Sequence, residues 1–257
     1  MIRARIHPTA IVDARAELGD EVEIGPYAIV EAGARVGSRT KLLAHAVIHG
    51  AASLGDDNVV HPFAVIGGAP QAKRHTSPSL RVEIGDRNVF REHVTVQAGT
   101  ERATRIGSDN LFMVSAHVAH DTIIGSSCVF ANAVLLAGHA VIEDHVTFGG
   151  AAGVVQFVRV GESAFVAGGA RCERDVPPFV IAQGDRARVR ALNKVGLQRR
   201  GFSPETIARL ERAFKALYVR KLPIAEALRT LDRSDPHVDR LARALESGTL
   251  RESSRPR

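Results

Sequence analysis

The sequence contains no tryptophan, two tyrosines and two cysteines, and it lacks any apolar run of the roughly 18 to 20 residues that a membrane span needs. Its first residues, MIRARIHPTAIVDARAEL, have no continuous apolar stretch of the kind found in a secretory signal. Two cysteines cannot build a disulfide framework, and no CxxC motif or Cys/His cluster indicates structural zinc. We therefore expect a cytoplasmic protein that performs no redox chemistry.

The composition is that of a soluble globular chain. The 257 residues are 45% hydrophobic, which is enough to bury a sizeable core, and 24% charged, which argues against a membrane protein or a disordered chain. The net charge of +6 is unevenly distributed, because residues 185–257 carry +9 and residues 1–184 carry −3. A basic segment can attract nucleic acid, an anionic membrane, a nucleotide phosphate or an acidic protein, so charge alone does not identify the partner. The scarcity of aromatic residues and the lack of a recognisable nucleic-acid motif disfavour nucleic acid.

Aliphatic residues recur at every sixth position through most of the chain. The first run is unbroken: Ile6, Val12, Leu18, Ile24, Val30, Val36, Leu42, Ile48, Leu54, Val60 and Ile66. The pattern resumes at Ile84, then slips by four residues and continues from Ile106 to Val166. Four positions after each of these recurring aliphatic residues, the residue is usually small. A period of six fits neither a helix nor a free-standing strand, and it predicts short strands joined by turns, each with one inward aliphatic residue.

This pattern predicts an all-β parallel β-helix for residues 1–186. Three faces of six residues give coils of 18 residues, stacked about 4.8 Å apart, and roughly nine coils. Two polar interruptions, at 67–83 and 97–105, are expected to be ejected loops. Glycines such as Gly37, which follow an inward residue, are expected at tight corners. Residues 187–257 predict a small helical domain, with a helix start at Ser203-Pro204-Glu205.

A cluster of histidines is the strongest candidate for chemistry. The segment AHVAHD contains His117, His120 and Asp121, and LAGHAV contains Gly138 and His139 one coil later. With 18 residues per coil, His120 should stack on Gly138 and then on Gln156, and Asp121 should stack on His139. Neutral imidazole suits proton removal near neutral pH. Two other interpretations stay open: histidines that merely cover the coil, and three imidazoles that hold a zinc ion. The His-x2-His spacing differs from the His-x4-His pair of gamma-class carbonic anhydrases.

Several motifs together resemble a known family. They include IHPTAIV, VEIGDRN, AHVAHD, LAGHAVIEDHVTFGG, QFVRVG, DVPPFVIAQGD and LNKVGLQRRGFS, which span nearly the whole chain. They are similar to those of the UDP-N-acetylglucosamine 3-O-acyltransferases of lipid A biosynthesis. The resemblance implies a homotrimer of left-handed β-helices with active sites between subunits, and it supplies the handedness, which periodicity does not. It also implies transfer of an R-3-hydroxyacyl group from acyl carrier protein to the sugar 3-hydroxyl, without a metal or other cofactor.

The resemblance also implies roles for individual residues. His120 would be the general base, Asp121 would orient it, and the Gly138 amide would stabilise the oxyanion. The positions matching the family's substrate-binding residues are Gln71, Arg74, His117, Asn132, His139, Gln156, Gly168, Asn193, Arg199 and Arg200. Gly168 stands where a bulky residue shortens the accepted acyl chain, so a longer chain is expected. The basic C-terminal part would attract the acidic acyl carrier protein and its phosphopantetheine arm.

The sequence departs from the family's pattern near the expected acceptor. Ala72 replaces an acidic residue, Gln97 and Ala98 replace a His-Arg pair, and Val155 replaces a histidine. Each change removes a polar contact, which leaves the acceptor open between UDP-N-acetylglucosamine and a 3-amino UDP-sugar that would be N-acylated. Two functions of a different class also stay open on the same scaffold, a zinc hydratase and a binding protein without catalytic activity.

Overall fold

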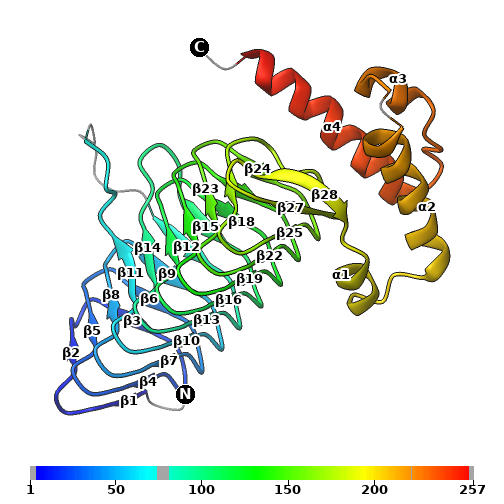
Figure 1. Ribbon diagram of the computed structural model, residues 1–257. Helices are drawn as coiled ribbons and strands as arrows, with labels where there is room; N and C mark the ends of the chain where they lie inside the picture. The colour runs from blue at the N-terminus through cyan, green and yellow to red at the C-terminus, as the bar shows by residue number, and fades with distance from the viewer. Residues whose placement is uncertain (1–3, 74–80, 221, 255–257) are drawn as a thin grey trace.

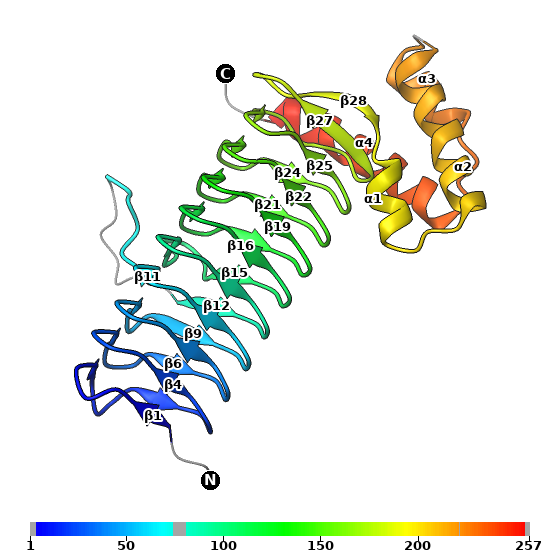
Figure 2. The same cartoon turned by 60° about the horizontal axis from the view of Figure 1, so that its bottom comes forward.

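The fold has two parts, a long β-solenoid and a group of helices at its C-terminal end (Figure 1). The structure is a computed structural model, and it describes residues 4–73, 81–220 and 222–254. In Figure 2 the first strand, β1 (Arg5–Ile6), lies at one end of the solenoid, and the helices lie beside the last coils at the other end. Among the described residues, no helix is long and apolar enough to cross a membrane.

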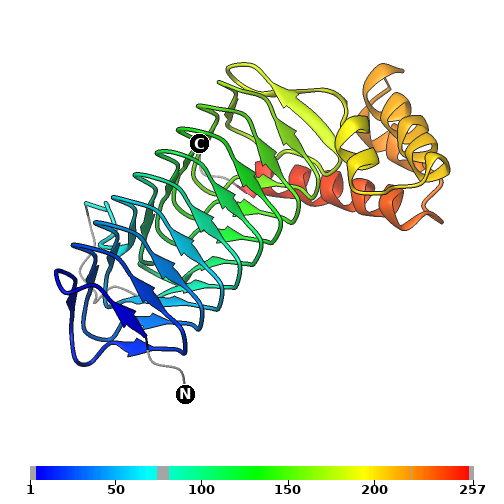
Figure 3. The same ribbon diagram turned by 90° about the horizontal axis from the view of Figure 1, so that it is seen from below.

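Three parallel sheets form the walls of the solenoid, and each coil passes from sheet A to sheet B to sheet C (Figure 3). Sheet A contains β1 (Arg5–Ile6), β4 (Glu23–Ile24), β7 (Lys41–Leu42), β10 (Val59–Val60), β13 (Val89–Phe90), β16 (Leu111–Phe112), β19 (Val129–Phe130), β22 (Thr147–Phe148), β25 (Phe165–Val166), β27 (Val180–Gln183) and β28 (Arg188–Leu192). Sheet B contains β2 (Ile11–Val12), β5 (Ile29–Val30), β8 (Val47–Ile48), β11 (Val65–Gly68), β14 (Thr95–Gln97), β17 (His117–Val118), β20 (Leu135–Leu136), β23 (Gly153–Val154) and β26 (Arg171–Cys172). Sheet C contains β3 (Glu17–Leu18), β6 (Arg35–Val36), β9 (Ala52–Leu54), β12 (Val82–Ile84), β15 (Thr104–Ile106), β18 (Ile123–Ile124), β21 (Val141–Ile142) and β24 (Arg159–Val160). The predicted parallel β-helix with C-terminal helices is confirmed.

The six-residue pattern coincides with the interior of the coil. From Ile24 onward the recurring aliphatic and phenylalanine positions are buried, whereas Ile6 is 47% exposed in β1, which is the edge strand of its sheet. Four inward phenylalanines stack along sheet A with ring centroids 4.9, 4.5 and 5.2 Å apart: Phe90, Phe112, Phe130 and Phe148. Burial of this continuous apolar column is the main stabilising contribution of the solenoid.

The pairing register shows where extra residues enter the coil. Regular neighbours differ by 18 residues, as in Val118↔Leu136. Val60 pairs with Phe90 and Phe90 pairs with Phe112, so the two predicted interruptions lengthen their coils without breaking the sheet. The four-residue slip deduced from the sequence is therefore confirmed.

The corners of the solenoid depend on left-handed backbone at residues other than glycine. In most coils the residue three positions after the inward one has positive φ, including Asp121 at 60° and His139 at 62°. Most of the glycines that follow an inward residue do lie in the corners, directly after a strand. These glycines do not supply the left-handed backbone, because among the described ones only Gly67 has positive φ. Gly37 is instead needed for close stacking, because a Cβ there would lie 2.3 Å from the Gly55 carbonyl oxygen of the next coil.

The helical part begins just after the last strand. β28 pairs antiparallel with β27, and the helices are α1 (Lys194–Arg199), α2 (Pro204–Phe214), η1 (Lys215–Val219), α3 (Ile224–Arg229) and α4 (Pro236–Ser254). The predicted start of α2 is confirmed, since the Ser203 hydroxyl accepts a hydrogen bond from the Thr206 amide. The division at residues 186/187 stays a prediction, and strand gives way to helix between Leu192 and Lys194.

Candidate active site

The residues proposed for chemistry lie together on the edge between sheets B and C, here called the B–C edge. His120 and Asp121 follow β17, Gly138 and His139 follow β20, and Gln156 follows β23 in the next coil. The three strands are hydrogen-bonded neighbours in sheet B. The Gly138 position packs so closely on the His120 ring that a Cβ there would lie 2.6 Å from its Cε1 atom.

Asp121 is the centre of a dense hydrogen-bond network. Its carboxylate is fully buried and accepts hydrogen bonds from the backbone amides of Thr100, Glu101 and Arg102 at 2.8–3.2 Å. The Thr100 hydroxyl donates to Oδ2 at 2.6 Å, and His120 Nδ1 lies 2.6 Å from the same oxygen. All of these donors favour a negative charge on the carboxylate.

The charge on Asp121 determines how His120 is oriented. Burial alone would raise the pKa of this carboxyl, but the hydrogen bonds from Thr100, its neighbouring amides and His120 outweigh burial, and the pKa lies well below its usual value. An ionised carboxylate only accepts hydrogen bonds, so His120 Nδ1 must carry the proton. The Nε2 atom of neutral His120 is then left with a free lone pair, which is the arrangement that a general base requires.

Two further histidines flank this pair. His139 packs edge-on against His120 with ring centroids 5.3 Å apart, and its Nε2 lies 3.7 Å from Asp121 Oδ2. Its other side stacks on Phe157 at 4.6 Å. His117 lies on the outer face of sheet B, where burial lowers its pKa and favours the neutral ring. Its Nδ1 lies 2.7 Å from the Thr95 hydroxyl, which fixes the ring plane.

The Gly138 amide is available to a bound molecule. On the neighbouring edge, the corresponding corner amides donate to a side chain of the next coil, as the Ser126 amide does to Asp144 Oδ1 at 2.7 Å. In the described part of the chain the Gly138 amide has no acceptor. A free N–H beside an imidazole is suited to stabilise negative charge that develops on a carbonyl oxygen.

An open groove runs along sheet B beside this edge. Its volume is about 1130 Å³, and its walls are largely apolar. The lining residues include His117, Ala119, Leu135, Gly153, Gln156, Phe157 and Arg171. Leu135 is 55% exposed and Phe157 is 56% exposed, so the groove offers apolar surface to a fatty chain close to the histidines.

The same cluster has some of the features of a metal site. The ligand atoms of His120, Asp121 and His139 lie within 4.8 Å of one another. However, both Asp121 oxygens already accept several N–H and O–H donors, and His120 Nδ1 is committed to Asp121. A cation at the centre would have to displace these donors, so the cluster is better suited to moving protons than to holding zinc.

The other residues expected to bind substrate lie on different edges of the chain. Asn132 and Gly168 lie on the edge between sheets A and B, and Gln71 is exposed in the first interruption. Arg74 lies outside the described residues. Within one chain, Asn132 and Gly168 are therefore on a different edge from His120.

A separate cavity of about 450 Å³ lies where the helices meet the edge between sheets C and A. Asn193, Arg199 and Arg200 line it together with His145 and Ser163. Asn193 caps α1 by accepting from the Gly196 amide at 3.2 Å, and its amide group donates to the Ser163 carbonyl at 2.9 Å. Arg200 forms an ion pair with Glu162 at 2.9 Å, whereas Arg199 is exposed. This cavity offers cationic donors for a phosphate.

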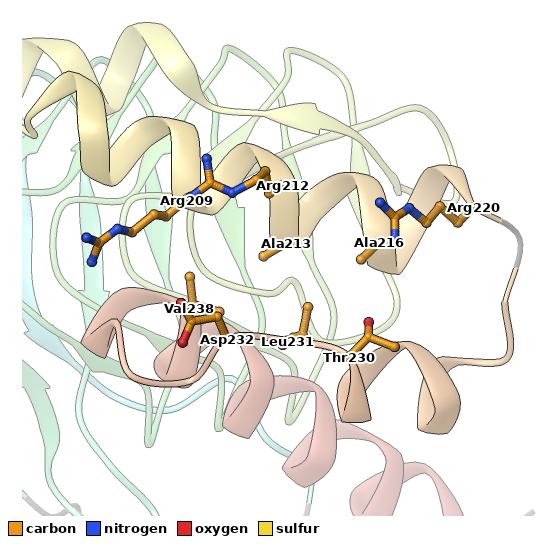
Figure 4. Close-up of a pocket in the computed structure, with 9 residues that line it drawn as sticks. All are labelled: Arg209, Arg212, Ala213, Ala216, Arg220, Thr230, Leu231, Asp232 and Val238. Carbon is orange, nitrogen blue, oxygen red and sulfur yellow. The ribbon is translucent and has the colours of Figure 1, made fainter.

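The helical part contains another cavity, of about 210 Å³, lined by arginines of α2 (Figure 4). Arg209, Arg212 and Arg220 surround it, and Asp232 contributes the opposite charge. None of the candidate catalytic residues lines this cavity.

The residues that differ from the family pattern are buried or half-buried. Gln97 is 4% exposed and Ala98 is fully buried, while Val155 packs against the core. Gln97 and Ala98 therefore contribute to packing, and Val155 also lines the groove with an apolar side chain.

Sequence reasoning missed three residues of the site. Thr95 fixes His117, Thr100 binds Asp121, and Phe157 supports His139. Phe157 could have been found by adding 18 to His139. The other two belong to coils lengthened by insertions, where that arithmetic fails.

A solenoid with a buried His-Asp pair, a free amide and an apolar groove defines an acyltransferase of the hexapeptide-repeat class. Residues 175–255 match the family model described as "Udp N-acetylglucosamine O-acyltransferase; Domain 2". The chain belongs to the UDP-N-acetylglucosamine O-acyltransferase family, because relatives of that name are 48% and 51% identical to it over 88% of its length.

Curated relatives and solved structures support this membership. An acyl-[acyl-carrier-protein]–UDP-N-acetylglucosamine O-acyltransferase of Stenotrophomonas maltophilia (strain R551-3) is 48% identical over 231 residues, 88% of each chain. The protein of that name from Anaeromyxobacter sp. (strain K) is 51% identical over 230 residues, 88% of this chain and 90% of its own. The crystal structure of UDP-N-acetylglucosamine O-acyltransferase from Moraxella catarrhalis RH4 has a TM-score of 0.90 at 38% identity and covers 94% of this chain and 96% of its own.

Proposed function

We propose that this protein transfers an R-3-hydroxyacyl group from acyl carrier protein to the 3-hydroxyl of UDP-N-acetylglucosamine, the first step of lipid A biosynthesis. The observation that carries the proposal is the pair of His120 and ionised Asp121 beside an apolar groove. The relatives carry the name of an O-acyltransferase, which favours this reaction over N-acylation of an amino sugar.

The geometry of the site supports the following reaction. His120 Nε2 removes the proton from the sugar 3-hydroxyl as its oxygen attacks the thioester carbonyl. The tetrahedral oxyanion accepts a hydrogen bond from the Gly138 amide. Collapse forms the ester, and the proton held by His120 passes to the departing phosphopantetheine sulfur. A positioned base contributes about 10²–10⁴-fold to such a step, and the activated thioester needs no metal or other cofactor.

We also propose that the active enzyme is a homotrimer. The outer face of sheet B carries Ile11, Ile29, Val47 and Val65, whereas sheet C pairs charges, as between Arg35 and Glu17. The edge between sheets A and B adds a stacked, exposed row: Tyr27, His45, Phe63 and His93. Such surface favours burial against another chain.

The positions of the candidate substrate-binding residues also support an oligomer. Asn132, Asn193 and His120 lie on three different edges of one chain, so a complete site needs residues of more than one copy. The acyl groove would then lie between subunits, with the cavity at Asn193 and Arg199 available to the nucleotide of UDP-sugar.

The basic C-terminal part suits docking of the acidic acyl carrier protein, and we propose a cytoplasmic location, where this carrier operates. Residues 185–257 carry a net +9 against −3 for the remainder. Long-range attraction of this kind raises association rates and orients the partner.

The proposed function is tested by product mass. Purified protein is incubated with a panel of R-3-hydroxyacyl carrier proteins and with either UDP-N-acetylglucosamine or its 3-amino analogue. We expect an ester of the first acceptor, which is released by mild alkali. Formation of an alkali-stable amide alone would reassign the acceptor, and no product with either sugar would reject acyl transfer.

A further inference from the structure

The segment Gly99–Arg102 wraps around the side chain of Asp121, although it belongs to the preceding coil. We propose that Thr100 is a positioning residue for catalysis, which holds the Asp121 carboxylate so that Oδ2 stays aligned with His120 Nδ1. This inference rests on the proposed function of the His120–Asp121 pair and assigns a purpose to the second interruption of the hexapeptide pattern.

The contacts divide between the two carboxylate oxygens. Oδ1 accepts from the amides of Thr100, Glu101 and Arg102 at 3.0, 2.9 and 2.8 Å. Oδ2 accepts from the Thr100 hydroxyl and from His120 Nδ1, both at 2.6 Å, and more weakly from the Thr100 amide at 3.2 Å. The three amides therefore mainly hold Oδ1. Among the side chains of the loop, the Thr100 hydroxyl donates to Oδ2, the oxygen that orients the imidazole.

The backbone on both sides is fixed as well. Arg102 Nε donates to the Asp121 carbonyl at 2.9 Å, and the Asp121 amide donates to the Thr104 hydroxyl at 2.9 Å. At Gly99 a Cβ would lie 1.6 Å from the Arg102 carbonyl oxygen, so only glycine permits this tight turn. The backbone of this loop is therefore held in place so that its consecutive amides point at the Asp121 carboxylate.

The Thr100 hydroxyl would influence the reaction by orienting His120, without contacting the substrate itself. Without this hydroxyl, Oδ2 keeps His120 Nδ1 at 2.6 Å and the longer contact with the Thr100 amide at 3.2 Å, and the carboxylate can rotate about its amide contacts. Rotation tilts the imidazole away from the position in which Nε2 meets the sugar hydroxyl. Partners of this kind, one step removed from the reacting atoms, typically affect activity by about 10- to 100-fold.

The decisive variants are Thr100→Val, which removes the hydroxyl at nearly constant shape, and Thr100→Ser, which restores it. Thr104→Val is the matched control, because it deletes a hydroxyl that touches the Asp121 backbone and not its carboxylate. For each protein kcat, both KM values and the thermal unfolding midpoint are measured with acyl carrier protein and UDP-N-acetylglucosamine.

We expect Thr100→Val to lower kcat by about 10- to 100-fold with both KM values within about twofold of wild type. Thr100→Ser should recover kcat to within about threefold of wild type. Thr104→Val should lower the thermal unfolding midpoint at least as much as Thr100→Val does, but it should change kcat less. An unchanged kcat in Thr100→Val, or a kcat that follows the unfolding midpoint across the three variants, overturns the inference. A raised KM at unchanged kcat overturns it too, because Thr100 would then bind substrate. Absence of product with the wild-type protein would instead reject the proposed function.

Discussion

At the residue scale, the site depends on how a buried carboxylate is kept charged. His120 and Asp121 could be identified from the sequence because AHVAHD and LAGHAV lie 18 residues apart, one coil of the solenoid. The residues that donate hydrogen bonds to Asp121 could not be identified in this way. They come from a coil with four extra residues, so the 18-residue repeat does not predict which residues lie beside Asp121. The reason why Asp121 remains ionised, and so fixes the tautomer of His120, is visible only in the structure.

Replacing Asp121 by asparagine tests this electrostatic role. The pKa of Asp121 is lowered in the folded protein, so its ionisation contributes stability above about pH 4, the usual range of an unfolded aspartate, and that contribution is lost as pH falls through the lowered pKa. We expect Asp121→Asn to unfold at a lower temperature than wild type at pH 7, with the difference shrinking below about pH 4. Melting curves across this range provide the measurement, with exposed Asp20→Asn as the control. A difference independent of pH contradicts the assignment.

At the element scale, the hexapeptide pattern determined which residues face inward and how the strands pair. It did not reveal how the corners turn, because left-handed backbone occurs at polar and aromatic residues such as Asp121 and Tyr27. The glycines have another purpose: at Gly37 the next coil leaves no space for a methyl group. This contact is set by stacking between coils and has no signature within one hexapeptide.

A matched pair of glycine substitutions distinguishes these two purposes. Gly37→Ala brings a Cβ to 2.3 Å from the Gly55 carbonyl, whereas at Gly68 the nearest atom to a new Cβ lies 3.8 Å away. We expect Gly37→Ala to reduce the free energy of unfolding by about 1–3 kcal/mol and Gly68→Ala to change it by no more than about 1 kcal/mol. Denaturant unfolding of both variants gives these values. Equal effects would show that stacking does not limit the Gly37 position.

At the scale of the whole molecule, the chain separates a binding groove on the solenoid from a basic helical part at its end. The helical domain was predicted for residues 187–257, beyond the six-residue pattern, and the start of α2 follows from Ser203 and Pro204. The way the helices join the last coils was not predictable, because Arg240 forms ion pairs with Glu162 and with Glu143, the latter 97 residues earlier in the sequence. The cavity at Arg199 and Arg200 arises from this junction.

The charge separation predicts a dependence on salt. Raising the ionic strength from about 0.05 to about 0.5 M should lower kcat/KM for the acyl carrier protein by about tenfold, because screening weakens attraction to the basic part. The same acyl group on uncharged pantetheine is the control, and its kcat/KM should change much less. Equal salt dependence of both donors contradicts the docking proposal.

The most direct test of the central claim is the rate of ester formation by His120→Ala, measured by product mass with R-3-hydroxyacyl carrier protein and UDP-N-acetylglucosamine. With the folded assembly retained, as judged by sedimentation and thermal unfolding, loss of the base should reduce the rate by about 10²–10⁴-fold. A folded variant that forms the ester at a rate within about threefold of wild type would contradict the account, because His120 could not then be the group that accepts the proton.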